Sequence, residues 1–435
     1  MTPKTFKIKS FGCQMNVYDG ERMSELLTGN GMSAASEGEE ADLVVLNTCH
    51  IREKAAEKAY SDVGRLNRAD GPKPIIALAG CVAQAEGVEA KRRSKLIDLV
   101  VGPQAYHRLP ELVAEASRGL RPVDTDMPAI SKFDALPARR KASPSAFLTV
   151  QEGCDKFCTY CVVPYTRGAE ISRPWDDIVN EAHQLVACGA REIVLLGQNV
   201  NAWNNQERGL ADLIRALSVI DGLERIRYTT SHPADMTDAL IAAHADVEKL
   251  MPYLHLPVQS GSNRILKAMN RSHTADTYLG IIEKMRHSRP DIAISGDFIV
   301  GFPGETEEDF EETLRIVDAV RYASAYSFKY SPRPGTPAAS MEDQIPREIK
   351  DERLQRLQAR ISEHQLAFNR SKVGTKTKVL IERAGRLAGQ MIGRSPWLQS
   401  VHLQTPRGIG EVVDVTLVGA GPNSMTGAER QKAAA

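Results

Sequence analysis

The stretch Ala146-Phe-Leu-Thr-Val-Gln-Glu-Gly-Cys154-Asp-Lys-Phe-Cys158-Thr-Tyr-Cys161 determines how the rest of the chain is interpreted. Residues 146–151 alternate in character and are rich in β-prone side chains, which predicts a strand. The loop that follows carries three cysteines at C-x3-C-x2-C spacing, with Tyr160 directly before the third. We therefore expect three thiols on the loop that leaves the C-terminal end of a strand.

Three thiolates so close in sequence are typical of an iron–sulfur cluster, because each can bind a different iron of one cubane. Three protein ligands leave the fourth iron open to a substrate or cofactor. A structural zinc site usually needs four ligands in two pairs, and the chain has no paired C-x2-C elsewhere. Cys154, Cys158 and Cys161 are therefore predicted cluster ligands, with zinc or unrelated buried thiols as the alternatives.

The whole-chain composition is that of a globular protein with more than one domain. The chain has 435 residues, of which 42% are hydrophobic and 25% charged, and its formal net charge is zero. Any nucleic-acid signal must therefore be local. We find no signal peptide at the start and no run of membrane-spanning length. Seven cysteines in such a chain predict a cytoplasmic protein that uses thiols for metal binding.

Residues 1–120 are predicted to form a small parallel α/β domain. The expected strands are residues 6–11, 42–46, 74–79 and 96–101, with amphipathic helices between them, such as 17–27 and 51–66. Cys13, Cys49 and Cys81 each follow one of the first three strands, and parallel strands end along one edge of a sheet. We interpret these cysteines as a second three-thiol cluster site, with incidental core thiols as the alternative. Cys188 is interpreted as packing.

Residues 121–145 are rich in Pro, Ala, Ser and Arg, which predicts a semi-rigid linker. The linker contains the basic run Arg139-Arg140-Lys141. We interpret this run as solvated rather than as a polyanion contact.

Residues 146–371 show six successive strand-then-helix units, which predicts an open, partial β/α barrel. The expected strands are residues 146–151, 192–196, 226–230, 253–256, 292–300 and 326–330. Polar, Gly-rich segments leave their C-terminal ends, as a ligand pocket requires. His232 and His255 are either acid–base groups or pocket-wall residues. Thr306 and Asp309 predict a helix capping box, and a charged helix over 345–371 is expected to pack back on the barrel.

Residues 372–435 are predicted to form a small β-barrel, with strands at 377–382, 387–391, 399–403 and 412–417 and a tail from about 425. Between residues 370 and 394 the only acidic residue is Glu382. The basic residues there are Arg370, Lys372, Lys376, Lys378, Arg383, Arg386 and Arg394. This excess favours either an RNA-binding surface or a solvated basic edge. The chain has no Walker-type phosphate loop and no H-E-x-x-H motif.

The order of these three domains resembles the methylthiotransferases, a family of radical S-adenosylmethionine (SAM) enzymes whose last domain is the RNA-associated TRAM type. Four stretches are similar to the tRNA-2-methylthio-N6-dimethylallyladenosine synthases within that family. They are Gly12-Cys-Gln-Met-Asn16, Asn47-Thr-Cys-His-Ile-Arg-Glu-Lys-Ala55, Gly153-Cys-Asp-Lys-Phe-Cys158 with Val163-Pro-Tyr-Thr-Arg-Gly168, and Gly393-Arg-Ser-Pro-Trp397. Relatives that modify a ribosomal protein or threonylcarbamoyl-adenosine in tRNA share both cysteine triads. Residues 50–55 are what favours the dimethylallyl-type adenosine.

The resemblance implies an α/β fold with an N-terminal parallel α/β domain, a partial (β/α)6 radical-SAM core over 146–371 and a TRAM-like β-barrel. It implies two 4Fe-4S clusters. One lies on Cys13, Cys49 and Cys81, the first triad, and the other on Cys154, Cys158 and Cys161, the second triad. SAM is expected at the open iron of the second triad, with Tyr160, Gln198 and Gly301 in its pocket.

The implied reaction adds a methylthio group to C2 of an adenosine beside the anticodon. One SAM supplies the radical that opens the C–H bond, and another SAM methylates sulfur held at the first triad. The implied partners are the tRNA anticodon loop and a reducing protein such as flavodoxin or ferredoxin, with the sulfur donor unassigned and the chain expected to be a monomer. The alternative of another class is a non-catalytic, metal-stabilised RNA-binding protein, against which both triads argue.

Overall fold

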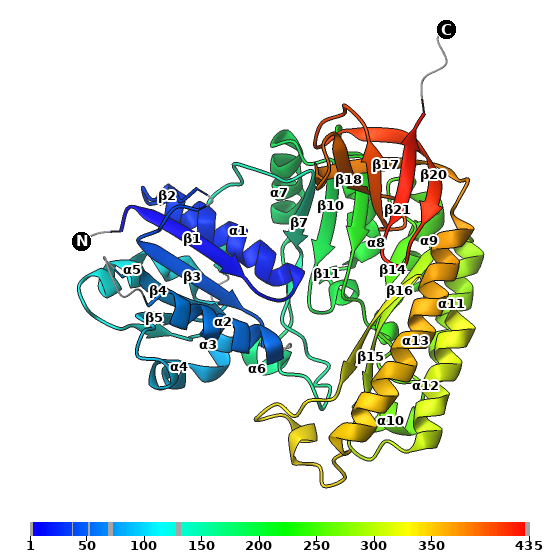
Figure 1. Cartoon of the computed structure of the whole chain (residues 1–435), viewed down its shortest axis with the longest axis horizontal. Helices are drawn as coiled ribbons and strands as arrows, with labels where there is room; N and C mark the ends of the chain where they lie inside the picture. Colours follow the sequence, from blue (N-terminus) through cyan, green and yellow to red (C-terminus); the bar gives the residue numbers. More distant parts are fainter. Residues whose placement is uncertain (1–2, 37, 51–52, 68–72, 128–131, 431–435) are drawn as a thin grey trace. The chain divides into compact units, whose positions relative to one another are not determined.

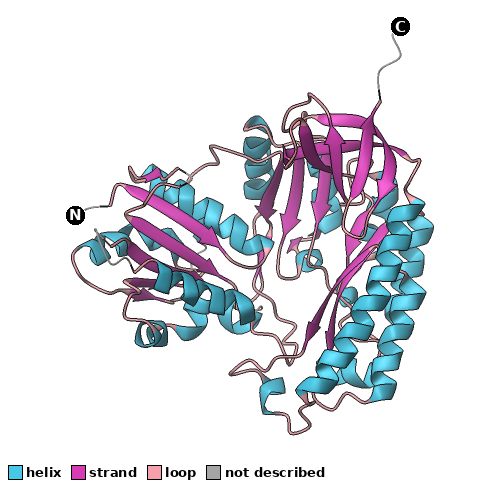
Figure 2. Cartoon of the chain, viewed as in Figure 1, coloured by secondary structure: helices cyan, strands magenta, loops and turns pink. Residues whose placement is uncertain are grey.

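The computed structural model describes the chain except residues 1–2, 37, 51–52, 68–72, 128–131 and 431–435 (Figure 1). The chain divides into two compact units. The first contains residues 1–140, 152–155 and 161–170, and the second contains 141–151, 156–160 and 171–435. Both combine helices with sheets (Figure 2).

The first unit is built on a six-stranded sheet in the order β2-β1-β3-β4-β5-β6, and every adjacent pair is parallel. Its strands are β1 (Thr5–Ser10), β2 (Ser33–Ala34), β3 (Leu43–Thr48), β4 (Ile75–Gly80), β5 (Leu99–Val101) and β6 (Val123–Asp124). All six side chains of β3 are buried, as expected for a parallel strand covered on both faces. The predicted parallel α/β fold is confirmed.

Helices pack on both faces of this sheet. Along β3, Leu43 and Val45 belong to one apolar cluster, whereas Val44 and Leu46 belong to another. The first cluster contains residues of α1 (Gln14–Gly29) and α5 (Leu109–Ser117). The second contains residues of α2 (Glu53–Arg65), α3 (Cys81–Glu86) and α4 (Val88–Arg93). The unit is therefore a doubly wound α/β sheet.

The segment predicted as a linker, residues 121–145, contributes to the first unit up to residue 140. Within it, β6 extends the sheet and Lys132 is buried. Arg139 is also buried and pairs with Glu21 at 2.9 Å, so the interpretation of Arg139 as a solvated basic residue is wrong. Arg140 and Lys141 are exposed, as expected.

The second unit contains six parallel strands in two three-stranded sheets, β13-β10-β7 and β14-β15-β16. An isolated parallel bridge pairs Ile226 of β13 with Leu250, three residues before β14 begins at Tyr253. The strands are β7 (Ser145–Thr149), β10 (Glu192–Leu196), β13 (Arg225–Tyr228), β14 (Tyr253–His255), β15 (Ala293–Val300) and β16 (Ser324–Lys329). The predicted partial (β/α)6 barrel is confirmed, and each strand overlaps its predicted range.

Helices connect these strands and cover the outside of the partial barrel (Figure 1). They are α7 (Trp175–Ala187), α8 (Leu210–Ser218), α9 (Asp238–Asp246), α10 (Asn263–Ala268), α11 (Ala275–Ser288), α12 (Glu307–Val320) and α13 (Arg347–Ser371). The predicted capping box of Thr306 and Asp309 begins α12. The helix α13 packs back on the partial barrel, as predicted, with Leu357 and Ile361 buried in the core. Short elements complete the loops: α6 (Val163–Arg167), β8 (Gln151–Glu152), β9 (Ile171–Ser172), β11 (Asn204–Asn205) and β12 (Arg208–Gly209).

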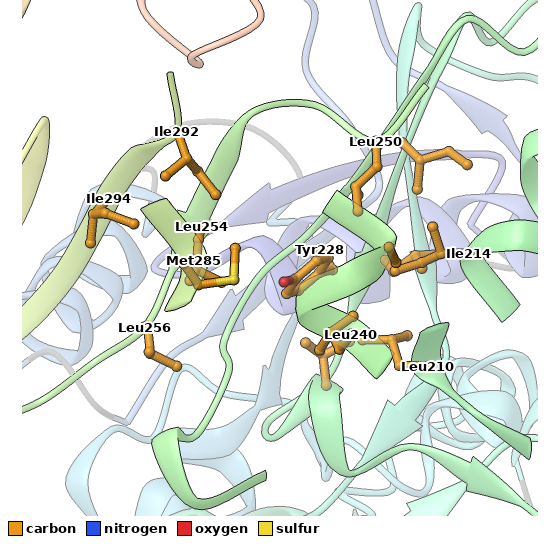
Figure 3. Packing of buried hydrophobic residues seen from close by; sticks show 14 of the residues in the cluster. Leu210, Ile214, Tyr228, Leu240, Leu250, Leu254, Leu256, Met285, Ile292 and Ile294 are labelled. Atoms are coloured by element: carbon orange, nitrogen blue, oxygen red, sulfur yellow. The ribbon is translucent and has the colours of Figure 1, made fainter. Parts of the chain in front are cut away.

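The core of the second unit lies between these strands and helices (Figure 3). Leu254 and Ile294 of the sheet pack with Met285 of α11 and Leu240 of α9, and each is at most 2% exposed. Tyr228 is also buried, and its hydroxyl pairs with His244 Nε2 at 2.7 Å. The one polar atom that the Tyr228 ring brings into this core is therefore satisfied.

The C-terminal region forms a closed barrel in the order β17-β18-β19-β21-β20, which confirms the predicted β-barrel. Its strands are β17 (Lys376–Ala384), β18 (Gln390–Arg394), β19 (Ser400–Gln404), β20 (Val412–Ala420) and β21 (Met425–Glu429). The fifth strand, β21, was expected to be tail. Its sequence, Met-Thr-Gly-Ala-Glu, carries little β signal, and pairing with β19 and β20 makes it a strand.

This barrel packs against the N-terminal ends of the core strands. Arg227 of β13 donates to the carbonyls of Ser395 and Pro396 at 2.9 and 2.8 Å, and its Nε donates to Glu192 at 2.8 Å. Trp397 Nε1 donates to the Asp291 carbonyl at 2.9 Å. The opposite, C-terminal strand ends carry the Gly-rich loops, so barrel docking and the predicted pocket use different ends of the strands.

Replacing Arg227 should destabilise the second unit strongly. Arg227→Ala removes the ion-pair partner of the buried Glu192 carboxylate, which then keeps only the Ser145 hydroxyl as a hydrogen-bond donor among the described residues. Breaking such a buried pair costs about 3–5 kcal/mol. The control Arg215→Ala removes an exposed pair with Asp246 and should cost about 0–1 kcal/mol. Urea unfolding followed by tryptophan fluorescence measures both, because Trp175, Trp203 and Trp397 all lie in the second unit. Equal urea midpoints for Arg227→Ala and Arg215→Ala would contradict the conclusion that the Arg227 contacts stabilise the second unit.

Candidate functional site

The cysteines of the first unit follow strands at the point where the strand order reverses. Cys13 follows β1, Cys49 follows β3 and Cys81 follows β4. In the order β2-β1-β3 the chain changes direction between β1 and β3, and ligands of open α/β sheets bind beyond the strand ends at such a switch point. The fold therefore carries three thiols to its natural ligand-binding edge.

The thiols of the first triad interact with one another. A hydrogen bond from Cys49, helped by the charge of Arg167, lowers the pKa of Cys13 to about 6 against the effect of burial. Burial raises the pKa of Cys81, and the charge of Cys13 raises it further while Arg167 opposes both. Cys13 Sγ also lies 3.1 Å from Asn16 Oδ1. The structure thus brings the three predicted ligands of the first triad together.

Two glycines allow this convergence. Gly12 has φ +121°, and a Cβ there would lie 2.1 Å from Cys49 Cβ. Gly80 has φ +86°, and its Cβ would lie 2.5 Å from the Thr48 carbonyl oxygen. Only glycine fits such a conformation at such a close approach. The backbone before Cys13 and Cys81 is therefore fixed by glycine.

Asparagines lock the start of α1 to the end of β3. Asn16 Nδ2 donates to Asn47 Oδ1 at 3.1 Å and to the Thr48 carbonyl at 3.0 Å, and Asn47 Nδ2 donates to the Asn16 carbonyl at 2.6 Å. Both asparagines are fully buried. A satisfied buried network of this kind holds the segments that carry Cys13 and Cys49 in one relative position.

A buried group of charges lies beside the first triad and within the same unit. Arg167 donates to Asp19 at 2.6 Å and to Glu152 at 2.5 Å, and Lys132 donates to Glu152 at 2.7 Å. All four side chains are at most 3% exposed. None of these four residues was predicted from the sequence to be a site residue. Only Arg167 lies in a motif used for the resemblance.

The donor set fits an iron–sulfur cluster. In the part of the chain that the structure describes, no three His, Cys, Asp or Glu side chains already stand in a metal-coordinating arrangement. The fit therefore depends on three convergent thiols, on the lowered pKa of Cys13 and on the nearby Arg167 cation. Thiolates next to a cation are the ligands that such clusters use.

The loop of the second triad is divided between the two units. In the first unit, Gly153 has φ +75°, and a Cβ there would lie 1.9 Å from the Ala169 carbonyl oxygen. The backbone N–H of Cys154 donates to the Gly168 carbonyl at 3.3 Å, and the N–H of Val163 points at Cys161 Sγ at 3.5 Å. Gly153 therefore permits the close backbone contact from which Cys154 projects.

In the second unit, Cys158 is buried beside the C-terminal end of α10. Arg271 Nη1 lies 3.8 Å from Cys158 Sγ, and its Nη2 donates to the Pro257 carbonyl at 2.6 Å. Asn270 Nδ2 donates to the carbonyls of Lys156 and Phe157 at 3.2 and 3.0 Å. These contacts hold the loop at Cys158, and sequence reasoning had assigned no role to Arg271 or Asn270.

The predicted SAM-pocket residues Tyr160, Gln198 and Gly301 all lie in the second unit. Tyr160 packs on the cluster of Met269, Phe302 and their neighbours. The Gln198 N–H donates to Gln151 Oε1 at 2.9 Å, which shapes the turn after β10. Gly301 has φ +68°, and a Cβ there would lie 2.3 Å from Lys350 Cγ, so the fold itself requires this glycine. Their contact with SAM stays a prediction.

His232 and His255, the two histidines predicted as acid–base or pocket-wall residues, have different hydrogen-bond partners. His232 Nδ1 accepts from the Ala234 N–H at 3.2 Å, and burial together with the charges of Arg271, His273 and Lys156 lowers its pKa to about 2. A neutral, hydrogen-bonded ring agrees with the pocket-wall interpretation of His232. His255 Nδ1 lies 3.1 Å from Ser295 Oγ.

Of the seven basic residues predicted between residues 370 and 394, five are exposed, and Lys372 and Arg394 are the half-buried ones. Lys372 Nζ lies 4.2 Å from the Trp397 ring centroid, and Arg394 pairs with Glu382 at 3.3 Å. Of the motif at residues 50–55, residues 51–52 lie outside the described part. Among the described helices, none has the length and apolarity that a membrane crossing requires.

Gly12→Ala should remove the first triad's capacity for a cluster, because the new Cβ would occupy the position of the Cys49 side chain. Iron bound after anaerobic reconstitution with iron and sulfide should fall by about four per chain, one cubane. Gly29→Ala is the matched control, since a Cβ at Gly29 meets no atom within 4 Å. Full iron content in Gly12→Ala would contradict the proposed geometry of the first site.

Comparison with known proteins gives matches over both units. The model of "Uncharacterized protein family UPF0004" matches residues 5–102, and that of the "Radical SAM superfamily" matches residues 148–317. Among solved structures, a radical S-adenosylmethionine methyltransferase from Kitasatospora setae has a TM-score of 0.58 at 14% identity and covers 77% of each chain. A cobalamin-dependent S-adenosylmethionine radical enzyme has a TM-score of 0.52 at 13% identity, over 83% of this chain and 56% of its own. These two likenesses show the fold.

Curated relatives match almost the whole chain. A protein of Novosphingobium aromaticivorans named tRNA-2-methylthio-N(6)-dimethylallyladenosine synthase is 67% identical over 98% of this chain and 97% of its own. Its namesake in Zymomonas mobilis is 67% identical over 98% of this chain and 96% of its own. At this identity and coverage, the chain belongs to the tRNA-2-methylthio-N(6)-dimethylallyladenosine synthase family of radical SAM methylthiotransferases.

Proposed function

We propose that this chain adds a methylthio group to C2 of N6-(dimethylallyl)adenosine next to the anticodon of tRNA. The observation that carries the proposal is the convergence of Cys13, Cys49 and Cys81 at the switch point of the first unit. A radical SAM enzyme that acts without a sulfur site needs only the C-x3-C-x2-C triad. The named activity of the chain's relatives agrees with a second triad that holds sulfur.

We assign each triad one 4Fe-4S cluster. When bound, the cluster on Cys154, Cys158 and Cys161 supplies the electron that cleaves SAM, and the other cluster holds the sulfur to be methylated. The protein's part is to orient and to shield. Gly12 and Gly80 fix the backbone before the first triad, and Gly153 fixes it before the second.

The Gly-rich loops at the C-terminal strand ends of 146–371 form the proposed SAM pocket, with Tyr160, Gln198 and Gly301 among its residues. Asn199 Nδ2 donates to Asp235 at 2.8 Å, and Asp235 accepts from Lys156 of the second cysteine loop at 2.8 Å. These bonds tie two strand-end loops to the cysteine loop. The loops therefore support one another within the second unit.

We assign residues 372–435 a TRAM-type role in binding tRNA. Sequence-specific RNA recognition favours single-stranded loops with unstacked bases, and an adenosine beside the anticodon is such a base. The exposed basic side chains of the barrel supply contacts for phosphates. We further propose that the enzyme acts as a monomer in the cytoplasm, reduced by a flavodoxin or ferredoxin.

Single cysteine variants separate the two sites. Cys154→Ala should abolish SAM cleavage and every later step, because its triad loses a ligand. Cys49→Ala should spare SAM cleavage and stop methylthio transfer. Both steps are measured on undermodified tRNA, by the release of 5′-deoxyadenosine and by mass spectrometry of nucleosides. Methylthiolation that survives in Cys49→Ala would remove the proposed role of the first triad.

The same assay with a ribosomal protein in place of tRNA tests the substrate. Transfer to the protein alone would overturn the assignment to tRNA while leaving the reaction class intact.

Reconstituted wild type should hold about eight irons per chain, and a Cys154/Cys158/Cys161 triple-alanine variant about four. Four irons in wild type falling to none in this variant would overturn the cluster on Cys13, Cys49 and Cys81.

Exposed lysines of β17 should contribute to tRNA affinity. Lys376 and Lys378 are two residues apart on β17 and both are exposed, so their side chains lie on the same face of the strand. The double variant Lys376→Ala/Lys378→Ala should weaken tRNA binding and reduce the salt dependence of log K by about 1–2. The control Lys284→Ala removes an exposed lysine of α11 that pairs with Asp238 and should change neither quantity. An unchanged salt slope in the double variant would place the RNA on another face.

A further inference from the structure

Two exposed aromatic side chains lie on the inner face of the partial barrel. Tyr326 is 54% exposed and Phe328 is 36% exposed, and they are two residues apart on β16. Their neighbour Ala325 packs against the helix-covered core, so the alternation of side chains along a strand turns both rings to the opposite, inner face. Single exposed apolar residues are ordinary, whereas apolar side chains that share one face indicate a binding surface.

A polar pair of side chains lies beside Tyr326 on the same face. Asp297 of β15 is the register partner of Tyr326, so the two side chains point to the same side of the sheet. The His255 ring lies edge-on to the Tyr326 ring at 6.3 Å, and its Nε2 lies 3.6 Å from Asp297 Oδ2. The Asp297 side chain is 27% exposed. The surface therefore presents an accessible carboxylate next to an exposed aromatic ring.

Towards the C-terminal end of β16 the inner face becomes apolar and continues to the second cysteine loop. Ile299 is the register partner of Phe328 and packs on the apolar cluster that contains Phe302. Tyr160, directly before Cys161, packs on the same cluster. The packed residues Ile299, Phe302 and Tyr160 belong to the second unit. The aromatic surface is thus connected by apolar packing to the loop of the second triad.

We propose that this inner face of β15 and β16 binds the target nucleoside. The adenine ring stacks on Tyr326, and the N6-dimethylallyl group packs on Phe328 and Ile299. The inference rests on the proposed function and names the side chains that hold its substrate. Enzymes that act on a base take it out of its stack and hold it against aromatic or apolar side chains.

The chemistry of the surface matches this nucleoside group by group. A purine can stack on an exposed ring because every base has a π-face. The branched hydrocarbon on N6 gains free energy by leaving water for an apolar surface, which Phe328 and Ile299 provide. The remaining N6–H is a hydrogen-bond donor, and the Asp297 carboxylate beside Tyr326 is an acceptor.

The test compares undermodified tRNA that carries the N6-dimethylallyl group with the same tRNA lacking it. Wild type should bind the dimethylallylated tRNA roughly tenfold or more tightly, because five carbons leave water. Phe328→Ala should bring the two Kd values close together, whereas Phe328→Leu keeps an apolar side chain and should keep most of the difference. Phe328→Ala that weakens both tRNAs equally would place this ring on another part of the RNA and overturn the inference.

Tyr326 is tested by the transfer reaction itself. Tyr326→Ala should lower kcat/KM for methylthio transfer to the dimethylallylated tRNA by roughly tenfold or more, the worth of one base stacked on an aromatic side chain. Tyr326→Phe keeps the ring and should stay near wild type. Unchanged transfer in Tyr326→Ala would overturn the inference.

Ser327→Ala is the matched control on the same strand. Ser327 pairs in register with the core residue Phe298, so it lies on the helix side of the sheet. This variant should keep both Kd values and the rate of transfer. The Tyr326 and Phe328 variants should also keep about eight irons and normal SAM affinity, measured without tRNA. A loss of SAM affinity in these variants would place SAM on this surface and overturn the inference.

The outcomes separate this inference from the proposed function. A wild type that transfers only to a ribosomal protein would overturn the proposed function, and the nucleoside surface with it. A wild type that modifies tRNA, with Tyr326→Ala and Phe328→Ala variants that match it in transfer and in the ratio of Kd values, would overturn only the role of this surface.

Discussion

Parallel strands end together, and both units of this chain depend on that constraint. In the first unit it brings together Cys13, Cys49 and Cys81, which are separated by more than thirty residues at each step. In the second unit it gathers the Gly-rich loops at one end of six strands. A cluster or cofactor needs ligands from several directions, and a parallel sheet supplies them without any local motif.

The strand ends that carry the cysteines contain glycines, which allow neighbouring backbones to come close, and arginines lie near the thiols. Glycines stand where a Cβ would strike a neighbouring strand end, as at Gly12 and Gly80. Arginines stand next to thiols in both units, Arg167 beside the first triad and Arg271 beside Cys158. Thiolates in a protein interior need such partners, because an unpaired buried anion would take up a proton instead.

The sequence predicted the strands well because their signal is local. Runs of Val, Ile and Leu bounded by glycine predict parallel strands, and the six strands of the core lie where they were expected. The convergence of the first triad also followed from the sequence, since it needs only strand order and direction. Contacts that depend on tertiary distance could not be predicted, such as that of Arg167 with Asp19, 148 residues away. The strand β21 was missed for the same reason, because its partners rather than its residues make it a strand.

Buried arginines dock the barrel on the core at the strand ends opposite the Gly-rich loops. Arg225 and Arg227, at the N-terminal end of β13, spend their guanidinium donors on barrel carbonyls and on Glu192. Burial lowers the pKa of Arg225 to about 10, partly offset by the charge of Glu192, and the side chain is 3% exposed. A flexible tether would let the barrel move relative to the core, whereas these bonds fix it at one end of the strands. The barrel therefore keeps one position relative to the Gly-rich loops, which lie at the opposite ends of the same strands.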